Sequence, residues 1–198
     1  CTSWGWEDVW TCDGVEYVNG IGSGADHKDG YLEFRAAMQA VDASIQVGAV
    51  GISDSDGWSN WGNEVIASAG QAMDFYVVHE YGFFDPPGGY DDVLARPQQF
   101  WQPAMADIRT AFEEHAGGRE APVAVTEYNL FAVQERDPDA WMSRAVNGLY
   151  VADTIGQMLK NGVSLSNQWD VAHGENGDDP GYGLMQADAF FRSPQYYV

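Results

Sequence analysis

The sequence predicts an α/β fold in which parallel strands are covered by helices. Short apolar runs rich in β-branched residues suit buried strands, and the segments between them place apolar residues three and four positions apart, as amphipathic helices do. The two kinds of segment alternate: a helix, then a strand and a helix three times, then a last strand. Such alternation is typical of parallel strands joined by helices. Four strands are half of an eight-stranded barrel, and they could also form a small open sheet.

The predicted elements follow these patterns along the chain. Strands are predicted at residues 45–51, 73–79, 123–127 and 163–169. Helices are predicted at residues 31–41, at 61–69, in a segment that ends near 115, and at 141–159. The predicted buried faces consist of Tyr31, Phe34, Met38 and Val41 in the first helix and of Ala145, Leu149, Ala152, Ile155 and Leu159 in the last. Ser193 and Pro194 predict the start of one further helix.

The N-terminal segment differs from the rest. Residues 1–28 are rich in Trp, Gly and Asp and show no sustained period, so they are predicted to form an irregular loop, with βα units over residues 29–198. Cys1 and Cys12 are close enough in sequence to form a local disulfide, which would indicate an oxidising compartment. Two free thiols are the alternative.

Composition and charge exclude several classes of partner. The chain has 198 residues, of which 45% are hydrophobic, so it can bury a sizeable core. Its net charge of −21 leaves no basic patch, so neither nucleic acid nor an anionic membrane is an expected partner. No apolar run approaches the roughly 20 residues that span a bilayer. No phosphate-binding loop or Cys/His cluster is present, and no cofactor is expected.

Polar and aromatic side chains gather where the predicted strands end. They are His79, Tyr81, Glu127, Asn129 and Trp169. An aromatic plane can cover the apolar face of a sugar ring, while amides and carboxylates bind its hydroxyls. A carboxylate beside a Tyr hydroxyl can be held ionised and oriented, as a glycosidase nucleophile requires. The alternatives are a solvated strand-end Glu127, a core imidazole at His79 and core packing of Trp169.

Several segments of the chain resemble the C-terminal half of the barrel of clan A retaining glycoside hydrolases, and most closely the α-L-arabinofuranosidase-like families. The segments are residues 40–49, 74–82, 125–129, 182–185 and 194–197. The resemblance implies a partial (β/α)8 TIM barrel that contains strands five to eight, within one domain over residues 1–198.

The resemblance also implies roles for the strand-end residues. Glu127 matches the nucleophile at the end of the seventh strand, and Tyr81, at the end of the sixth, would hydrogen-bond it. His79 would line the same pocket, Trp169 would form the floor of the sugar subsite, and Asn129 is predicted to contact substrate with them.

The pattern departs from the family at the second catalytic carboxylate. Retaining glycosidases need two carboxyl groups about 5–5.5 Å apart. In this clan the acid/base Glu follows an Asn at the end of the fourth strand, which this chain lacks. The one Asn-Glu pair, Asn63-Glu64, lies on a predicted helix, so Glu64 is assigned to that helix, and Glu7 is a distant substitute. This chain alone is therefore expected to be inactive, and a longer chain or a second chain to complete the barrel.

The function predicted from the sequence is retaining hydrolysis of glycosidic bonds in a polysaccharide, with α-L-arabinofuranosides as the substrate class that the resemblance suggests. The expected location is extracellular or at the cell surface. The alternative is a non-catalytic carbohydrate-binding or cell-surface structural protein that retains the barrel. Paired acids at Asp54 and Asp56, and at Asp178 and Asp179, lack the spacing of a calcium loop, so no metal site is expected.

Overall fold

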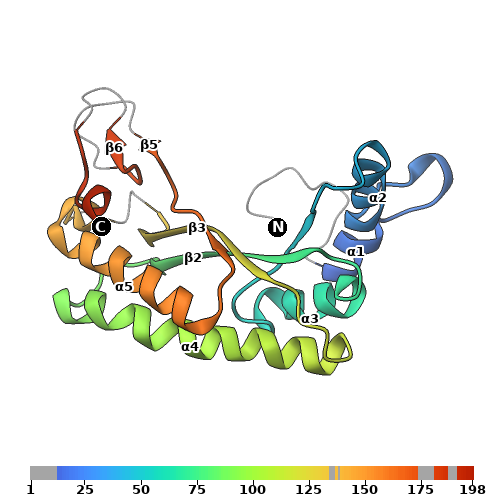
Figure 1. The fold of residues 1–198 in the computed structure, drawn as a ribbon, viewed down its shortest axis with the longest axis horizontal. Helices are drawn as coiled ribbons and strands as arrows, with labels where there is room; N and C mark the ends of the chain where they lie inside the picture. The colour runs from blue at the N-terminus through green and yellow to red at the C-terminus, as the bar shows by residue number, and fades with distance from the viewer. Residues whose placement is uncertain (1–12, 134–136, 138, 174–180, 187–190) are drawn as a thin grey trace. The chain divides into compact units, whose positions relative to one another are not determined.

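The computed structural model describes residues 13–133, 137, 139–173, 181–186 and 191–198 (Figure 1). The chain divides into two compact units. Unit 1 consists of Cys1–Val78 and Ala106–Val123, and unit 2 consists of His79–Met105 and Ala124–Val198. The predicted disulfide between Cys1 and Cys12, the substitute Glu7 and the acidic pair at Asp178 lie outside the described residues. The prediction of one domain over the whole chain stays a prediction.

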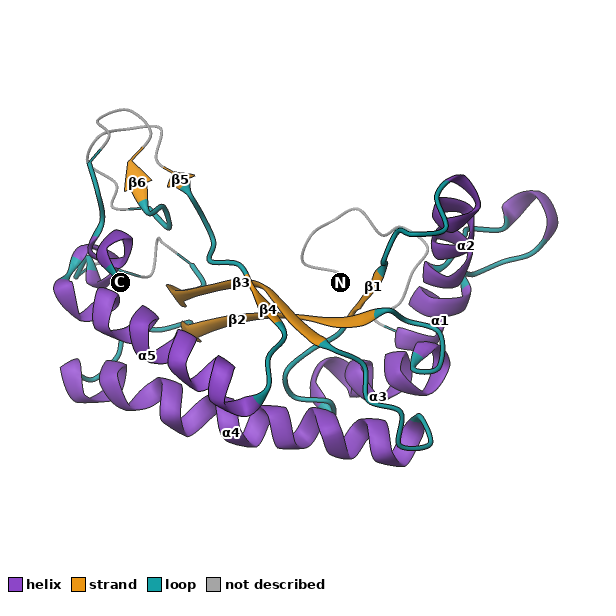
Figure 2. Cartoon of the chain, in the orientation of Figure 1, coloured by secondary structure: helices purple, strands orange, loops and turns teal. Residues whose placement is uncertain are grey.

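Four strands form one sheet in the order β1-β2-β3-β4 (Figure 2). They are β1 (Gly48–Val50), β2 (Phe75–Phe83), β3 (Val123–Phe131) and β4 (Leu165–Ser166). Within unit 1, β1 runs parallel to the start of β2, and within unit 2, β3 runs parallel to β4. A second sheet pairs two short parallel strands, β5 (Ala172–His173) and β6 (Met185–Gln186). The prediction of an α/β fold with parallel strands is confirmed.

The central strands are longer than predicted, and the outer ones are shorter. β3 continues four residues beyond Glu127, because Leu130 and Phe131 are fully buried and extend the apolar strand. Tyr81 likewise lies inside β2, which ends at Phe83. The prediction that Glu127 is the tip of its strand is therefore wrong. The fourth strand, predicted over residues 163–169, is reduced to the two residues of β4.

In unit 1, a short helix replaces part of the predicted loop over residues 1–28. The helix α1 (Gly14–Asn19) begins at Asp13, whose carboxylate accepts hydrogen bonds from the backbone of Val15 and Glu16. Val18 is fully buried and anchors it. A 3₁₀ turn, η2 (Gly24–Asp26), follows. The irregular-loop prediction is thus corrected over these residues, since a capped helix of this length is too short to show a period.

The helix α2 (Tyr31–Val41) has the predicted bounds but not the predicted burial. Tyr31 is buried, and its hydroxyl donates to the Val47 carbonyl at 2.7 Å. Phe34, Met38 and Val41 are exposed, Val41 by 89%. The described part of unit 1 covers only the Tyr31 end of the apolar stripe, and the remainder faces solvent.

The helix α3 (Gly57–Ala69) contains the predicted helix at residues 61–69, and a non-helical turn precedes it. Trp58, Ser59 and Asn60 have positive φ values of 52°, 62° and 73° before the regular helix. The prediction that Glu64 is a helix residue is confirmed, and its carboxylate accepts the Gly14 backbone N–H at 2.8 Å. This contact gives Glu64 a structural partner in unit 1.

In unit 2, the helix α5 (Ala145–Asn161) buries a different face from the predicted one. The buried residues are Val146, Asn147, Gly148, Tyr150, Val151, Thr154 and Met158. The predicted face contains the exposed Ala145, Leu149, Ala152 and Leu159. The polar and small residues on the buried face have specific contacts: Asn147 donates to Met142 O and to Gln195 Oε1, and Gly148 lies against Pro194.

The remaining helices match the predictions more closely. The helix α4 (Tyr90–His115) ends where predicted and contributes residues to both units. A 3₁₀ turn, η4 (Trp141–Ser143), precedes α5. The turn η5 (Pro194–Tyr197) has Ser193 as its N-cap and Pro194 in its first turn, as expected. Among the described helices, none is long and apolar enough to cross a membrane.

The carboxylate of Asp74 links several segments of unit 1 through hydrogen bonds. Arg35 donates to both of its carboxylate oxygens, at 2.9 and 3.2 Å, and the Val47 backbone N–H donates at 2.8 Å. The hydrogen bonds from Arg35 are the largest of the effects that hold the pKa of Asp74 below its ordinary value. One carboxylate thereby joins α2, the segment before β1 and the start of β2.

Replacing Asp74 with Ala should lower the free energy of unfolding by about 2–3 kcal/mol near neutral pH, because Arg35 and the Val47 N–H lose a charged acceptor. The contribution of Asp74 is fully present above the ordinary carboxyl pKa and is lost as pH falls through its lowered folded pKa, since the protonated acid no longer pairs with Arg35. Urea titrations at several pH values measure both effects. Exposed Glu113→Ala is the control and should change stability by less than about 0.5 kcal/mol.

Candidate functional site

The carboxylate of Glu127 lies at the centre of a group of side chains in unit 2. The Tyr81 hydroxyl donates to its Oε2 at 2.9 Å, and His79 Nδ1 faces the same oxygen at 3.5 Å. Among the described residues, no hydrogen bond reaches Oε1. The Glu127 side chain is 26% exposed. The structure therefore brings together three of the residues that the sequence singled out.

Tyr81 is a permanent proton donor in this group. Burial, and then the hydrogen bond to Glu127, raise the pKa of its hydroxyl far above the ordinary value for tyrosine. The ring of Tyr81 meets that of Tyr182 edge-on, with centroids 6.0 Å apart, and the Tyr182 hydroxyl donates to Ala132 O at 2.8 Å. The contact with Tyr182 thus holds the Tyr81 ring in place, and the Tyr81 hydroxyl stays protonated at neutral pH.

His79 has a second contact that the sequence reasoning missed. Its Nε2 lies 2.9 Å from Thr126 Oγ1, and its side chain is 46% exposed. The prediction that His79 is part of the polar group is consistent with this position, whereas a buried core imidazole is not. Thr126 directly precedes Glu127 in the sequence, and this position could have indicated that Thr126 lies near the site.

Contact of Asn129 with substrate stays a prediction; in the structure its side chain is fully buried, and both of its polar atoms are hydrogen-bonded. Its amide nitrogen donates to the backbone carbonyls of Trp169 and Tyr182, at 2.5 and 2.9 Å. Its carbonyl oxygen accepts the Leu130 backbone N–H at 2.8 Å. Asn129 is therefore a structural residue that joins β3 to the segments after β4.

Trp169 is positioned by its backbone, and its ring is accessible. Its N–H donates to Tyr128 O at 3.1 Å, its carbonyl accepts from Asn129, and its peptide bond to Asp170 is cis. The residue is 40% exposed, which does not fit a role in core packing. An indole with an accessible surface remains suited to contact with a sugar ring.

A second polar group borders the first, and its members were not among the predicted site residues. His173 Nδ1 lies 3.3 Å from Asp170 Oδ2, and its ring meets Tyr182 edge-on with centroids 5.4 Å apart. Tyr182 in turn contacts Tyr81. Asp170 immediately follows Trp169 in the sequence, but nothing in the sequence pattern indicated that His173 and Tyr182 would join it.

Glu80 is the carboxylate nearest to His79 in the sequence, and it has another partner. Its Oε1 lies 3.7 Å from Arg96 Nη2, and its side chain is only 12% exposed. Glu127 differs from Glu80 in that its carboxylate accepts from Tyr81 and its side chain is 26% exposed.

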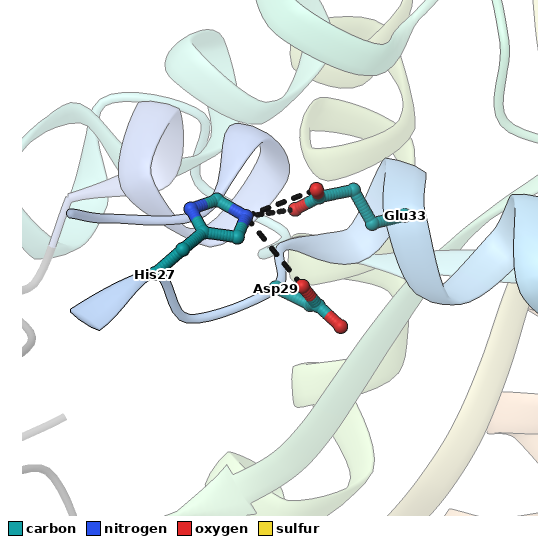
Figure 3. A group of neighbouring side chains, drawn as sticks. All are labelled: His27, Asp29 and Glu33. Atoms are coloured by element: carbon teal, nitrogen blue, oxygen red, sulfur yellow. Dashed lines mark hydrogen bonds and ion pairs between the residues drawn. The ribbon is translucent and has the colours of Figure 1, made fainter. Parts of the chain in front are cut away.

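In unit 1, the described residues contain one group with the spacing of metal ligands: His27, Asp29 and Glu33 (Figure 3). His27 Nε2 lies 2.9 Å from both Glu33 oxygens and 3.5 Å from Asp29 Oδ1. Glu33 also accepts the Gly30 backbone N–H, which caps α2. The hydrogen bond to Glu33 is the largest effect that raises the pKa of His27. Both carboxylates thus face the His27 imidazole, and that of Glu33 also caps the start of α2.

Comparison with solved structures identifies proteins of similar fold. No protein-family model matches the sequence, and no curated protein matches it. The family 51 α-L-arabinofuranosidase of Thermotoga petrophila RKU-1 is similar over 92% of this chain and 44% of its own, with 17% identity and a TM-score of 0.63. A family 51 α-L-arabinofuranosidase from Bifidobacterium longum is similar over 83% and 38%, with 13% identity and a TM-score of 0.62.

A Paenibacillus polymyxa xyloglucanase of glycoside hydrolase family 44 is also similar, over 73% of this chain and 36% of its own, at 15% identity and a TM-score of 0.54. The chain therefore spans less than half the length of each of these three proteins. The predicted resemblance to α-L-arabinofuranosidases of clan A is confirmed at the level of the fold. The chain has a glycoside hydrolase-like α/β fold with a parallel sheet.

Replacing Asn129 with Ala should lower the free energy of unfolding by about 2–4 kcal/mol, because two backbone carbonyls and the Leu130 N–H lose their partners. Thermal and urea unfolding measure the loss. The control is Gln99→Ala, at an exposed position of α4 in the same unit. Equal stability of the two variants would contradict the structural role of Asn129.

The Tyr81 hydroxyl should remain protonated at about pH 10, where an ordinary tyrosine is half ionised. Phenolate absorbance is measured for wild type and Tyr81→Phe between neutral pH and about pH 11, and the difference should show no ionisation of Tyr81. Glu127→Gln should lower the Tyr81 pKa only in part, because burial is the larger cause of the shift. A full phenolate step in the difference curve would refute this account of the donor.

Proposed function

We propose that this chain is part of the catalytic domain of a retaining glycoside hydrolase in which Glu127 is the nucleophile. The observation that carries the proposal is the asymmetric contact pattern of the Glu127 carboxylate. Tyr81 and His79 both face Oε2, at 2.9 and 3.5 Å, and Oε1 is left for a substrate. The fold likeness to glycoside hydrolases supports the same reading.

In the proposed reaction, Glu127 Oε1 attacks the anomeric carbon and forms a covalent glycosyl ester while the glycosidic C–O bond breaks. A second carboxyl group, from outside this chain, gives its proton to the leaving oxygen and then takes a proton from the water that cleaves the ester. The hydrogen bond from Tyr81 orients the carboxylate before attack. The chain alone is therefore proposed to be inactive.

The four strands β1 to β4 are proposed to correspond to strands five to eight of a (β/α)8 barrel. The remainder would come from a longer chain or from a second chain. Two kinds of observation support this completion: the chain covers at most 44% of the three similar enzymes, and apolar residues are exposed on the outer strands. Val50 on β1 and Leu165 on β4 are each about half exposed. A further strand beside either would bury them.

The proposed substrates are polysaccharides that contain α-L-arabinofuranosides, and the proposed location is outside the cell or at its surface. The names of the similar family 51 enzymes support the substrate class. The accessible ring of Trp169 would cover the apolar face of a sugar. The same ring favours the second candidate, a non-catalytic carbohydrate-binding protein that retains the barrel.

The test is azide rescue in the protein that contains the completed barrel. Glu127→Ala should lower the turnover of an activated aryl glycoside by about four orders of magnitude or more. Added azide should restore it and give a glycosyl azide of inverted configuration, because azide occupies the place of the removed carboxylate. Exposed Glu114→Gln is the matched control and should keep full turnover. Unchanged hydrolysis by Glu127→Ala would exclude the role, and sugar binding without turnover by wild type would favour the second candidate.

A further inference from the structure

Thr126 has a contact that the proposed mechanism does not use. Its hydroxyl lies 2.9 Å from Nε2 of His79, while the other ring nitrogen of His79 faces the Glu127 carboxylate at 3.5 Å. One imidazole therefore lies between a hydroxyl and a carboxylate that neighbour each other on β3. The two partners differ in what they can donate, and that difference determines where the proton of a neutral His79 resides.

The carboxylate of Glu127 can only accept hydrogen bonds, whereas the hydroxyl of Thr126 can donate or accept. If neutral His79 carried its proton on Nε2, the lone pair of Nδ1 would face the negative oxygen of Glu127, which is repulsive. If the proton is on Nδ1, it points to Glu127, and the Nε2 lone pair accepts the proton of the Thr126 hydroxyl. Only this tautomer satisfies all three groups.

We propose that Thr126 is a positioning residue that holds neutral His79 in its Nδ1–H tautomer, with that proton directed at Glu127 Oε2. The hydroxyl fixes the ring from the side opposite the carboxylate, which matters because the His79 side chain is 46% exposed and has little packing to restrain it. In water, histidine favours the other tautomer, so the arrangement requires a donor at Nε2, and Thr126 supplies it.

The consequence for catalysis rests on the proposed function. Two protons, from Tyr81 and His79, then point at Oε2, which leaves Oε1 free of both groups and available for attack. The two contacts also hold the orientation of the carboxylate, because both must open before it can rotate. Thr126 contacts neither the substrate nor the reacting oxygen and acts only through His79.

Nitrogen NMR of the 198-residue chain tests the proposal without an activity assay. The chain has four histidines, and the signals of His79 are assigned by their loss in His79→Gln. Above the pH at which His79 becomes neutral, wild type should show a protonated Nδ1 and an unprotonated Nε2. Thr126→Val, which keeps the shape but lacks the hydroxyl, should shift His79 toward the Nε2–H form, and Thr126→Ser should restore the wild-type signals.

A wild-type spectrum with the proton on Nε2 would overturn the proposal, and so would a Thr126→Val spectrum that matches wild type. The wild-type measurement needs no substitution, so it decides the question even if a variant fails to fold. In the completed enzyme, Thr126→Val should lower kcat about tenfold and Thr126→Ser by less than about twofold. An enzyme without glycosidase activity would refute the proposed function and leave the NMR result standing.

Discussion

The buried amide of Asn129 is the interaction on which the site in unit 2 depends. A buried amide that cannot reach water must find its partners inside the protein, and Asn129 finds them on three different segments. It ties β3 to the carbonyls of Trp169 and Tyr182. Tyr182 then packs against Tyr81, and Tyr81 holds Glu127. The orientation of the carboxylate thus depends on a polar contact in the core.

This dependence explains why the polar residues of unit 2 differ in exposure although they are close in sequence. Glu127 and Asn129 are two residues apart on β3, so they point to the same side of the strand. Glu127 remains partly accessible and has one oxygen without a hydrogen bond among the described residues, whereas Asn129 has every polar atom paired. Glu127 therefore has an oxygen available for chemistry, whereas Asn129 has no unpaired polar atom.

The sequence was sufficient for the order of the elements, for the bounds of α2 and for the grouping of His79, Tyr81 and Glu127. These follow from local apolar periods and from the rule that parallel strands direct their ends to one edge of a sheet. The role of Asn129 was not predictable in this way. A strand-end amide suits a sugar hydroxyl and a buried backbone carbonyl equally well, and only the fold brings Trp169 and Tyr182 to it.

The errors on α5 have a related cause. Periodicity identifies a stripe of apolar residues but not the neighbour that it meets. On α5 the contacts of Asn147 with Met142 and Gln195, and the close approach of Pro194 to Gly148, select a face that contains polar and small residues. The stripe through Leu149 and Leu159 is left exposed.

Exposed apolar stripes of this kind occur in each unit, on α2 and on α5, and they are costly because contiguous apolar surface in water promotes association. Unit 1 also contains β1 and unit 2 contains β4, the two outer strands of the sheet. An added strand and helix beside either would satisfy the backbone groups of the strand and bury the apolar stripe together. The proposed completion of the barrel would give both surfaces a neighbour of this kind.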